Sequence, residues 1–309
     1  MSLNPEVEKY IAFQRLAGYK YDLQARVLRS FARYADSRGD ECILVNTAMD
    51  WALLDPAINF ARIKYAMLRR FGLWLRASDP RHELPPPNAL GHRERWNPPT
   101  PLLEPDEINA ILDAALRLRP CDSIRPQTYH HYFGLVGATG IRRSEAISLL
   151  LSDLLFDESA LLIRESKFGK SRIIPIDRSV ADALKRYLVL RQSLTLSHDY
   201  VFVGLNLRPL NNNTVWKTFR NLARECGIER PSGHRYPTVH SLRHTFAVRT
   251  LERSLRESRD GTVPILPALS TYLGHAHVSS TYWYLQCTPA LMRAISNTAE
   301  SHFLNGAPS

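Results

Sequence analysis

Two proline-rich stretches interrupt the first third of the chain and limit where regular structure can form. Residues 78–88 read Ser-Asp-Pro-Arg-His-Glu-Leu-Pro-Pro-Pro-Asn and residues 96–101 read Trp-Asn-Pro-Pro-Thr-Pro, so they hold seven prolines. Proline lacks a backbone N–H and excludes a continuous helix. A chain of 309 residues is long enough for two packed cores. We therefore predict an N-terminal domain over residues 1–95, a linker over 96–103 and a second domain over 104–309.

The segment before the prolines has the periodicity of amphipathic helices, with apolar residues at helical spacing around residues 10–13, 23–34 and 57–74. We therefore predict an all-helical N-terminal domain. Basic and aromatic residues alternate over residues 62–76. This pattern fits either the solvated face of a helix or a surface that binds an anionic polymer. The second interpretation makes candidate DNA contacts of Arg62, Lys64, Arg69 and Arg70.

The whole chain is basic, with 40 Lys and Arg against 30 Asp and Glu and a net charge of +10. A basic excess favours a polyanionic partner such as nucleic acid without proving one. The N-terminus has no basic-then-apolar signal pattern, and no apolar run approaches the eighteen or so residues that a membrane span needs. Both observations indicate a soluble cytoplasmic protein. The four cysteines are scattered without C-x-x-C spacing, which predicts neither disulfides nor a zinc site.

The second domain is predicted to be mainly helical with a small β-sheet, so the fold class is mainly α within α+β. Two strands joined by a glycine-containing hairpin are expected over residues 161–164 and 172–176, and a third short strand over 200–204. Helices are expected over residues 106–118, 126–138, 144–151, 178–194, 213–226, 278–285 and 291–303, with another that starts near His240.

The stretch from His240 to Tyr284 holds more reactive side chains than a structural segment needs. His240 and Arg243 are three residues apart, so a helix presents both on one face near its start. Backbone N–H groups and the helix dipole favour a phosphate there, and arginine adds a planar fork of donors. Taken alone, however, such a pair is more often structural than functional.

Other groups of the same kind lie elsewhere in the second domain. Arg142 follows the helix-breaking Gly140, and Lys167 sits at the predicted hairpin tip. Gly274-His275 reads either as a capped helix end or as a donor site, and the run Tyr282-Trp283-Tyr284 either as an aromatic core stripe or as a source of a nucleophile. The joint order of these groups favours the functional interpretation.

In that order the groups resemble the tyrosine recombinases, the phage-integrase-like enzymes of DNA strand exchange. The resemblance covers residues 104–290. The matching boxes are Thr-Gly-Ile-Arg-Arg-Ser-Glu over residues 139–145, Lys167 in the hairpin, His-Ser-Leu-Arg-His over 240–244, Leu-Gly-His over 273–275, and a tyrosine nine residues after that last histidine. Any one box is weak, but five in the family's order make chance agreement improbable.

The resemblance implies a site-specific recombinase or integrase that cleaves and rejoins DNA through a 3′-phosphotyrosyl intermediate. It implies Tyr284 as the nucleophile and a supporting role for Glu145. The other implied catalytic residues are Arg142, Lys167, His240, Arg243 and His275. Further DNA contacts are expected from basic side chains near these boxes, namely Arg143, Lys170, Arg172 and His244. The partners implied are double-stranded DNA and other copies of the chain, in a tetramer on paired sites.

Neither a cofactor nor a metal is expected, because the sequence has no P-loop and no acidic cluster with two-metal spacing around the site. A type IB topoisomerase-like enzyme and an inactive DNA-binding relative remain as alternatives. The biological task is also open among transposition on behalf of a mobile element, phage or island integration, and resolution of replicon dimers.

Three local features leave choices open. Arg142 and Arg143 are adjacent, and alignment to Gly140 and Glu145 favours Arg142 as the phosphate donor. Tyr282 and Tyr284 are two positions apart on a predicted helix, about 200° of rotation, so only one of them can face the site. Residues 257–263 make the segment before His275 longer than the family leads us to expect, which predicts a surface loop.

Overall fold

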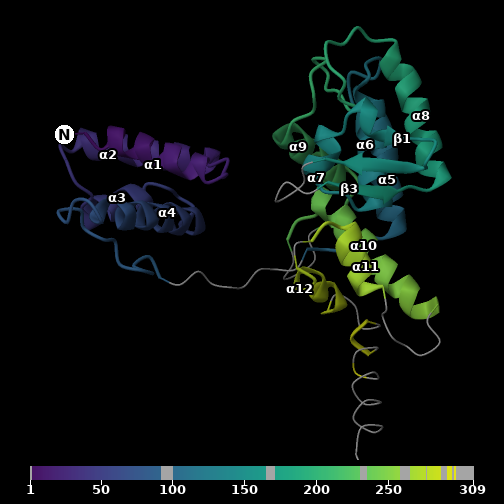
Figure 1. Cartoon of the computed structure of the whole chain (residues 1–309). Helices are drawn as coiled ribbons and strands as arrows, with labels where there is room; N and C mark the ends of the chain where they lie inside the picture. The colour runs from purple at the N-terminus through teal and green to yellow at the C-terminus, as the bar shows by residue number, and fades with distance from the viewer. Residues whose placement is uncertain are drawn as a thin grey trace, which may run out of the picture. The chain divides into compact units, whose positions relative to one another are not determined.

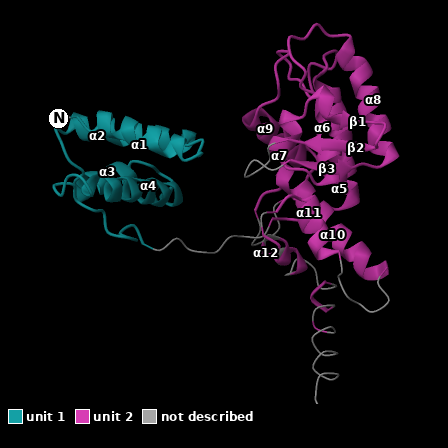
Figure 2. Cartoon of the chain, viewed as in Figure 1, with its two compact units in different colours: residues 1–97 teal, residues 98–309 magenta. Residues whose placement is uncertain are grey.

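The computed structural model of the chain describes residues 2–91, 100–164, 171–229, 235–257, 265–275, 277–286, 291–293 and 296. The chain divides into two compact units, Met1–Asn97 and Pro98–Ser309 (Figure 2). Both units are built mainly from helices, and the strands form one small sheet in the second unit (Figure 1). The predicted fold class, mainly helical with a small sheet, is therefore confirmed.

Unit 1 contains four described helices, α1 (Asn4–Leu16), α2 (Asp22–Ser37), α3 (Val45–Leu53) and α4 (Ile58–Arg76). Their buried faces meet in one core, in which Phe31 packs edge-on against Trp51 and Tyr10 contacts Phe71. The predicted helical segments correspond to α1, α2 and α4. The helix α3, nine residues long, was not predicted; it buries Trp51 and Ala48 against its neighbours.

The first proline-rich stretch belongs to unit 1. The backbone N–H of Glu83 donates to the carbonyl of Ile43 at 2.8 Å, and the N–H of Ile43 donates in turn to Nδ1 of His82 at 3.1 Å. The side chain of Arg62 donates to the carbonyl of Leu90 at 2.9 Å. Residues 78–91 therefore fold back on the helices by hydrogen bonds even though proline keeps them from forming a helix themselves.

Unit 2 is organised around α6, which lies at the centre of its main core. The packed pairs include α5 with α6, α6 with α10 and α6 with α8. Tyr132, Phe133 and Val136 of α6 are buried in this core. The helices of this part are α5 (Pro105–Leu116), α6 (Arg125–Thr139), α7 (Arg143–Ser148), α8 (Arg178–Gln192), α9 (Asn212–Glu225) and α10 (Val239–Glu257), with the short 3₁₀ helix η1 (Leu151–Asp153).

The sheet has three antiparallel strands in the order β1 (Leu154–Leu155), β2 (Ala160–Ile163) and β3 (Arg172–Pro175). In β3 the buried Ile174 is flanked by the exposed Ile173, as the alternation of a strand requires. Ile163 pairs with Arg172 at the end of the ladder, next to the hairpin connection. Two of these strands match the prediction; β1 is only two residues long and was missed.

A smaller apolar cluster holds the C-terminal part of unit 2. It joins buried residues of α10 to α11 (Leu266–Tyr272) and to the segment formed by α12 (Ser279–Tyr282) and the 3₁₀ helix η2 (Trp283–Gln286). Leu251, Leu273 and Tyr284 are buried together there. The segment 273–275 and Tyr284 are therefore anchored on α10, the helix that carries His240 and Arg243.

Two expectations need correction. Residues 200–204 do not form a strand: Leu150 pairs with Tyr200 and Val203 with Pro209 only as isolated bridges. Proline lacks the N–H that would continue a ladder. The end of the predicted linker is also part of unit 2, because Leu103 is buried and its N–H donates to Oγ1 of Thr245 at 2.8 Å.

Several predictions fall outside the described residues. These are the hairpin tip with Lys167 and Lys170, most of the predicted loop over 257–263, and most of the predicted helix over 291–303. Among the residues that the structure does describe, no helix combines the length and the apolar character needed to cross a bilayer.

Candidate active site

The position of Arg142 is set by the turn that ends α6. Gly140 has φ +62°, and a Cβ there would overlap the ring of Phe246 on α10. Only glycine satisfies both constraints without a shift. The chain then extends through Ile141, and Arg142 precedes the first turn of α7, where its backbone N–H donates to Oε2 of Glu145 at 2.8 Å. Arg142 therefore leaves the core at a fixed point, as the Gly140 signal predicts.

Three side chains form what we call the Glu145 cluster, namely Arg142, Glu145 and Arg172. Nη1 of Arg142 donates to Oε1 of Glu145 at 2.7 Å, while Nη1 and Nη2 of Arg172 donate to Oε1 and Oε2 at 2.9 and 2.8 Å. Glu145 is 6 % exposed. Burial by itself raises its pKa, but the hydrogen bonds and charge of Arg172, with those of Arg142, outweigh it and lower the pKa to about 2.

Arg243 is buried in α10 and connects two turns that are distant in sequence. Its Nη1 donates to the carbonyl of Gly140 at 2.7 Å, and its Nη2 donates to the carbonyl of Leu273 at 2.8 Å. Burial lowers its pKa to about 10, which leaves the guanidinium charged at neutral pH. Arg243 thus holds the Arg142 turn and the His275 turn against one helix.

The tautomer of His275 follows from its two partners. A guanidinium only donates, so Nε2, which lies 3.2 Å from Nη2 of Arg243, is the accepting nitrogen. Nδ1 then carries the hydrogen and donates to Oγ1 of Thr281 at 2.7 Å. Burial, together with Arg243 and Arg142, lowers the pKa of His275 to about 4. The ring is therefore neutral at physiological pH, and its Nε2 lone pair accepts from Arg243.

The aromatic rings beside this histidine form a continuous contact. His240 and His244 meet edge to face at 4.2 Å between ring centres, and His244 lies 5.4 Å from Tyr284. The rings of His275 and Tyr284 are nearly parallel at 6.2 Å. Burial, reinforced by neighbouring positive charge, lowers the pKa of His240 to about 4, and burial also lowers that of His244 to about 3. Both imidazoles are therefore neutral at pH 7.

Tyr284 and Tyr282 have opposite environments. Tyr284 is 2 % exposed and lies against the histidines, whereas Tyr282 is 54 % exposed. The predicted helix over 278–285 is split into α12 and η2, so the rotation between the two positions is not that of one regular helix. The exposed fractions nevertheless place one phenol in the interior and the other at the surface. The structure thus brings Tyr284 together with Arg142, Glu145, His240, Arg243 and His275.

Several candidate DNA contacts lie in unexpected places. Lys64 is 9 % exposed, and its ammonium donates to the carbonyl of Trp51 at 3.2 Å while lying over that ring, so it faces the core of unit 1. His244 is buried among the aromatic rings, and Arg172 is part of the Glu145 cluster. We do not retain Lys64 and His244 as proposed DNA contacts. The alternation of basic and aromatic residues in the sequence did not indicate that the side chain of Lys64 is buried.

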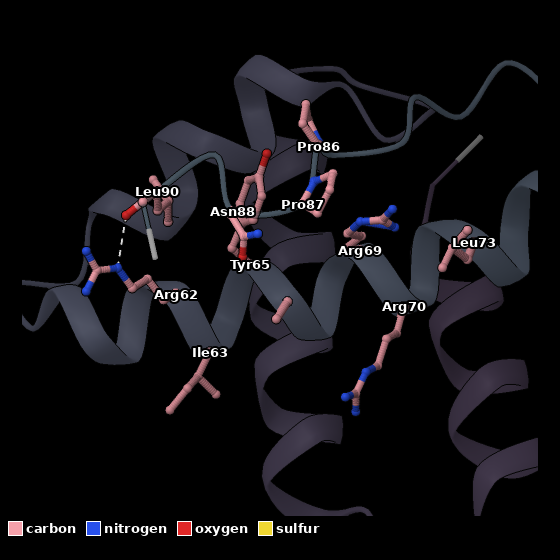
Figure 3. A pocket seen from close by; sticks show the side chains of 12 residues that line it. Arg62, Ile63, Tyr65, Arg69, Arg70, Leu73, Pro86, Pro87, Asn88 and Leu90 are labelled. Carbon is pink, nitrogen blue, oxygen red and sulfur yellow. Dashed lines mark hydrogen bonds between the residues drawn. The ribbon is translucent and has the colours of Figure 1, made fainter. Parts of the chain in front are cut away.

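The other three candidates of unit 1 surround a cavity of about 400 Å³ on α4. Arg62, Arg69 and Arg70 line it together with Pro86, Pro87 and Asn88, and Arg69 and Arg70 leave the helix in different directions (Figure 3). The folded proline-rich stretch thus forms one wall of a basic groove. Arg143 lies at the start of α7, next to Arg142, and is partly exposed.

Among the described residues, one group has the composition of a metal site: Cys42, Asp79 and His82 in unit 1. Nδ1 of His82 accepts the N–H of Ile43, so the neutral ring carries its hydrogen on Nε2 and has no free lone pair for a metal. The side chain of Arg81 also donates to both oxygens of Asp79. The group is therefore explained by protein contacts.

The contacts of three residues of the site were not predicted from the sequence. Thr281 fixes the tautomer of His275, and the carbonyl of Tyr272 accepts from Nε of Arg172 at 2.8 Å. Gly274 was read as part of a box, although its φ of +66° and its closeness to two guanidiniums are the physical reasons for glycine there. The only local indication of these contacts in the sequence was the Gly-His dipeptide after a helical segment.

Comparison with known proteins agrees with this geometry. The model of the phage integrase family matches residues 101–290. The integrase/recombinase y4rB of Sinorhizobium fredii is 35 % identical over 298 residues, which is 93 % of this chain and 93 % of that protein. The tyrosine recombinase XerD of Halalkalibacterium halodurans is 35 % identical over 193 residues, 62 % of this chain and 58 % of that protein.

Among solved structures, the Tn1549 transposon integrase in complex with transposon right end DNA has a TM-score of 0.63 at 17 % identity, covering 92 % of this chain and 94 % of that one. This likeness supports the fold. The chain belongs to the phage integrase family, and its fold and boxes are those of a site-specific tyrosine recombinase.

Gly274→Ala is expected to slow DNA cleavage by about 10- to 100-fold, the scale of a misplacement of about 1 Å in a reacting group. A Cβ at Gly274 would lie 2.8 Å from Nη1 of Arg172 and 3.1 Å from Nη1 of Arg142, so the guanidiniums must shift. Gly227→Ala is the matched control, because Gly227 has φ +69° and nothing within 4 Å of a Cβ. Equal single-turnover cleavage rates for the two variants would contradict the expectation.

Proposed function

We propose that the chain cleaves and rejoins double-stranded DNA at specific sites through a 3′-phosphotyrosyl intermediate in which Tyr284 is the nucleophile. The observation that carries the proposal is the junction at Arg243, whose guanidinium contacts both the turn of Arg142 and the side chain of His275. Tyr284 lies beside that histidine. Two positively charged hydrogen-bond donors, a neutral imidazole and a phenol therefore lie in one part of unit 2.

The arginines supply what attack on a phosphodiester requires. Negative charge accumulates on the non-bridging oxygens, and fixed guanidinium donors stabilise it. Arginine has five N–H donors. Within the described residues, Arg142 and Arg243 each donate from two of their three guanidinium nitrogens, Nη1 and Nη2. Each therefore keeps N–H groups for a phosphate. We assign Arg142 and Arg243 to the phosphate on this basis.

Activation of Tyr284 is the second requirement. An ordinary tyrosine has a pKa near 10, so forming phenolate at pH 7 costs about 4 kcal/mol. His240 and His275 are both neutral, and we assign to them the hydrogen bonds that take up the phenol proton or hold the phosphate, which for Nε2 of His275 means exchanging its bond from Arg243. By resemblance to the family, Lys167 protonates the departing 5′ oxygen.

The covalent intermediate removes the need for an energy source. A phosphotyrosyl ester keeps the free energy of the cleaved bond, so a 5′ hydroxyl can reverse the reaction and religate the strand. No step of the proposed cleavage and religation requires a metal or a cofactor. The chemistry is therefore isoenergetic, and the identity of the attacking 5′ end decides whether strands are restored or exchanged.

Double-stranded DNA is the proposed partner, and the net charge of +10 suits it. Arg62, Arg69 and Arg70 around the groove of unit 1 are proposed to contact phosphates, together with Arg143 and Lys170 in unit 2. We further propose that copies of the chain assemble as a tetramer on paired sites and that the enzyme serves a mobile element. The similarity in fold to a transposon integrase supports the last point.

The test of the function is the capture of a covalent complex. Duplexes tiled across the DNA that flanks the coding region are each nicked near one candidate cleavage position, so that cleavage releases a short fragment and religation fails. We expect one duplex to become attached to the protein, in excess EDTA as well as in magnesium. A loss of attachment in EDTA that zinc or magnesium restores would contradict the mechanism. Relaxation of supercoiled DNA without exchange would favour a topoisomerase.

A further inference from the structure

Arg172 is engaged on two sides by acceptors that belong to the site. Its Nη1 and Nη2 donate to the two carboxylate oxygens of Glu145, and its Nε donates to the carbonyl of Tyr272 at 2.8 Å. A guanidinium is the one side chain that can make a bidentate pair and a third bond in the same plane. Glu145 and Tyr272 are thereby fixed relative to each other by one side chain from β3.

These contacts close a ring. Glu145 also accepts from Arg142, and Nη2 of Arg142 donates to the carbonyl of Gly274, two residues after Tyr272. Gly274 lies against both guanidiniums, since a Cβ there would come within 3.1 Å of each. The ring therefore runs from Arg172 through Glu145 and Arg142 to the turn of residues 272–274 and back. His275 follows that turn directly.

The ring also includes the strand that leads out of the hairpin. Arg172 is the first residue of β3 and pairs with Ile163, so it stands at the end of the ladder where the connection with Lys167 begins. Buried charges keep their geometry only when every partner is in place. A displacement of Arg172 would let Glu145 draw Arg142 toward itself and away from Gly274.

We propose that Arg172 is a positioning residue of the recombination reaction: it holds Glu145 and the turn of residues 272–274 so that Arg142 and His275 engage the same phosphate. The proposal rests on the function proposed above. It replaces the sequence-based expectation that Arg172 binds DNA, because all three of its guanidinium nitrogens donate to protein acceptors, whereas Arg142 and Arg243 each use two. Arg172 itself touches neither the reacting phosphate nor the leaving oxygen.

The test uses the nicked duplex that the wild-type full chain attaches to, and it measures affinity and cleavage separately. Arg172→Lys keeps the charge beside the buried carboxylate but cannot form the bidentate pair. We expect it to bind DNA with an affinity within about twofold of wild type and an unchanged salt dependence, and to cleave about 10- to 100-fold more slowly at saturating protein. Arg178→Lys is the matched control, because Arg178 is 94 % exposed in its side chain.

A double-mutant cycle shows whether Arg172 acts through its partner. Residues of one network give non-additive effects. In a Glu145→Gln background, Arg172→Lys is therefore expected to slow cleavage by less than about threefold, far below its effect in the wild-type chain. The thermal unfolding of each variant is measured as well, so that a loss of cleavage caused by unfolding can be recognised. The retained DNA affinity is a second check on the fold.

The outcomes separate this inference from the proposed function. A wild-type chain that attaches to no duplex contradicts the function. A wild-type chain that attaches, with Arg172→Lys equally fast, contradicts the positioning role alone. A weaker affinity with a salt slope lower by about one unit identifies Arg172 as a phosphate contact instead. Full additivity with Glu145→Gln would likewise overturn the inference.

Discussion

Tyr284→Phe is expected to bind DNA normally and to form no covalent complex with a nicked duplex. Phenylalanine fills the same buried space beside His244 and His275. It lacks only the oxygen that attacks phosphorus, so the fold and the DNA-binding surfaces should remain. Without a nucleophile the yield of adduct should fall below detection, the largest effect predicted for any single substitution in this chain. Gel separation of the complex under denaturing conditions measures it.

Tyr282→Phe is the control, since Tyr282 is two residues away and 54 % exposed. We expect this variant to form adduct at close to the wild-type yield. Peptide mapping of the wild-type adduct gives an independent answer, because the modified peptide must carry the nucleotide on Tyr284. A nucleotide found on Tyr282, or an adduct that survives Tyr284→Phe, would show that the buried phenol is not the nucleophile.

Arg142→Ala should lower the rate of cleavage by on the order of 10²- to 10³-fold, the effect of removing one fixed donor from a developing oxyanion. DNA affinity should change little, because many other phosphate contacts hold the duplex. The guanidinium of Arg142 reaches Glu145 and Gly274 inside the site. Single-turnover cleavage at saturating protein, compared with a binding titration, separates the two effects.

Arg143→Ala is the neighbouring comparison. The backbone carbonyl of Arg143 accepts from the hydroxyl of Tyr132 at 2.9 Å, which fixes the main chain rather than the side chain. We expect a loss of cleavage well below that of Arg142→Ala, with any effect mainly on affinity. If the order of the two variants is reversed, the phosphate donor is Arg143 and the alignment of the turn after Gly140 is shifted by one residue.

Much of the fold could be predicted because its signals are local. Helical periodicity located α2, α4, α6 and α9 to within a few residues, and Gly140 located the turn before Arg142. The misses were elements whose stability comes from their neighbours. The helix α3 is short and depends on burying Trp51, while residues 201–203 are all buried and so lack the alternation of a strand.

The candidate site was predicted in composition but not in contacts. The spacing of the boxes identified Arg142, His240, Arg243, His275 and Tyr284, and the structure brings these side chains together. The spacing could not assign the direction of each basic side chain, because this depends on what packs against it. Lys64 turns inward to the carbonyl of Trp51, whereas Arg69 and Arg70 of the same helix line a groove.

By itself, the sequence determined the family of this protein, the order of its reactive groups and the helices that carry them, because periodicity and box spacing are properties of neighbouring residues. Only the tertiary structure decided which groups are partners. Arg243 reaches Gly140, 103 positions away, and Arg172 reaches Tyr272, 100 positions away. Such pairs follow from how helices and strands pack. Hydrogen bonds formed on that packing set the tautomer of His275 and the acidity of Glu145.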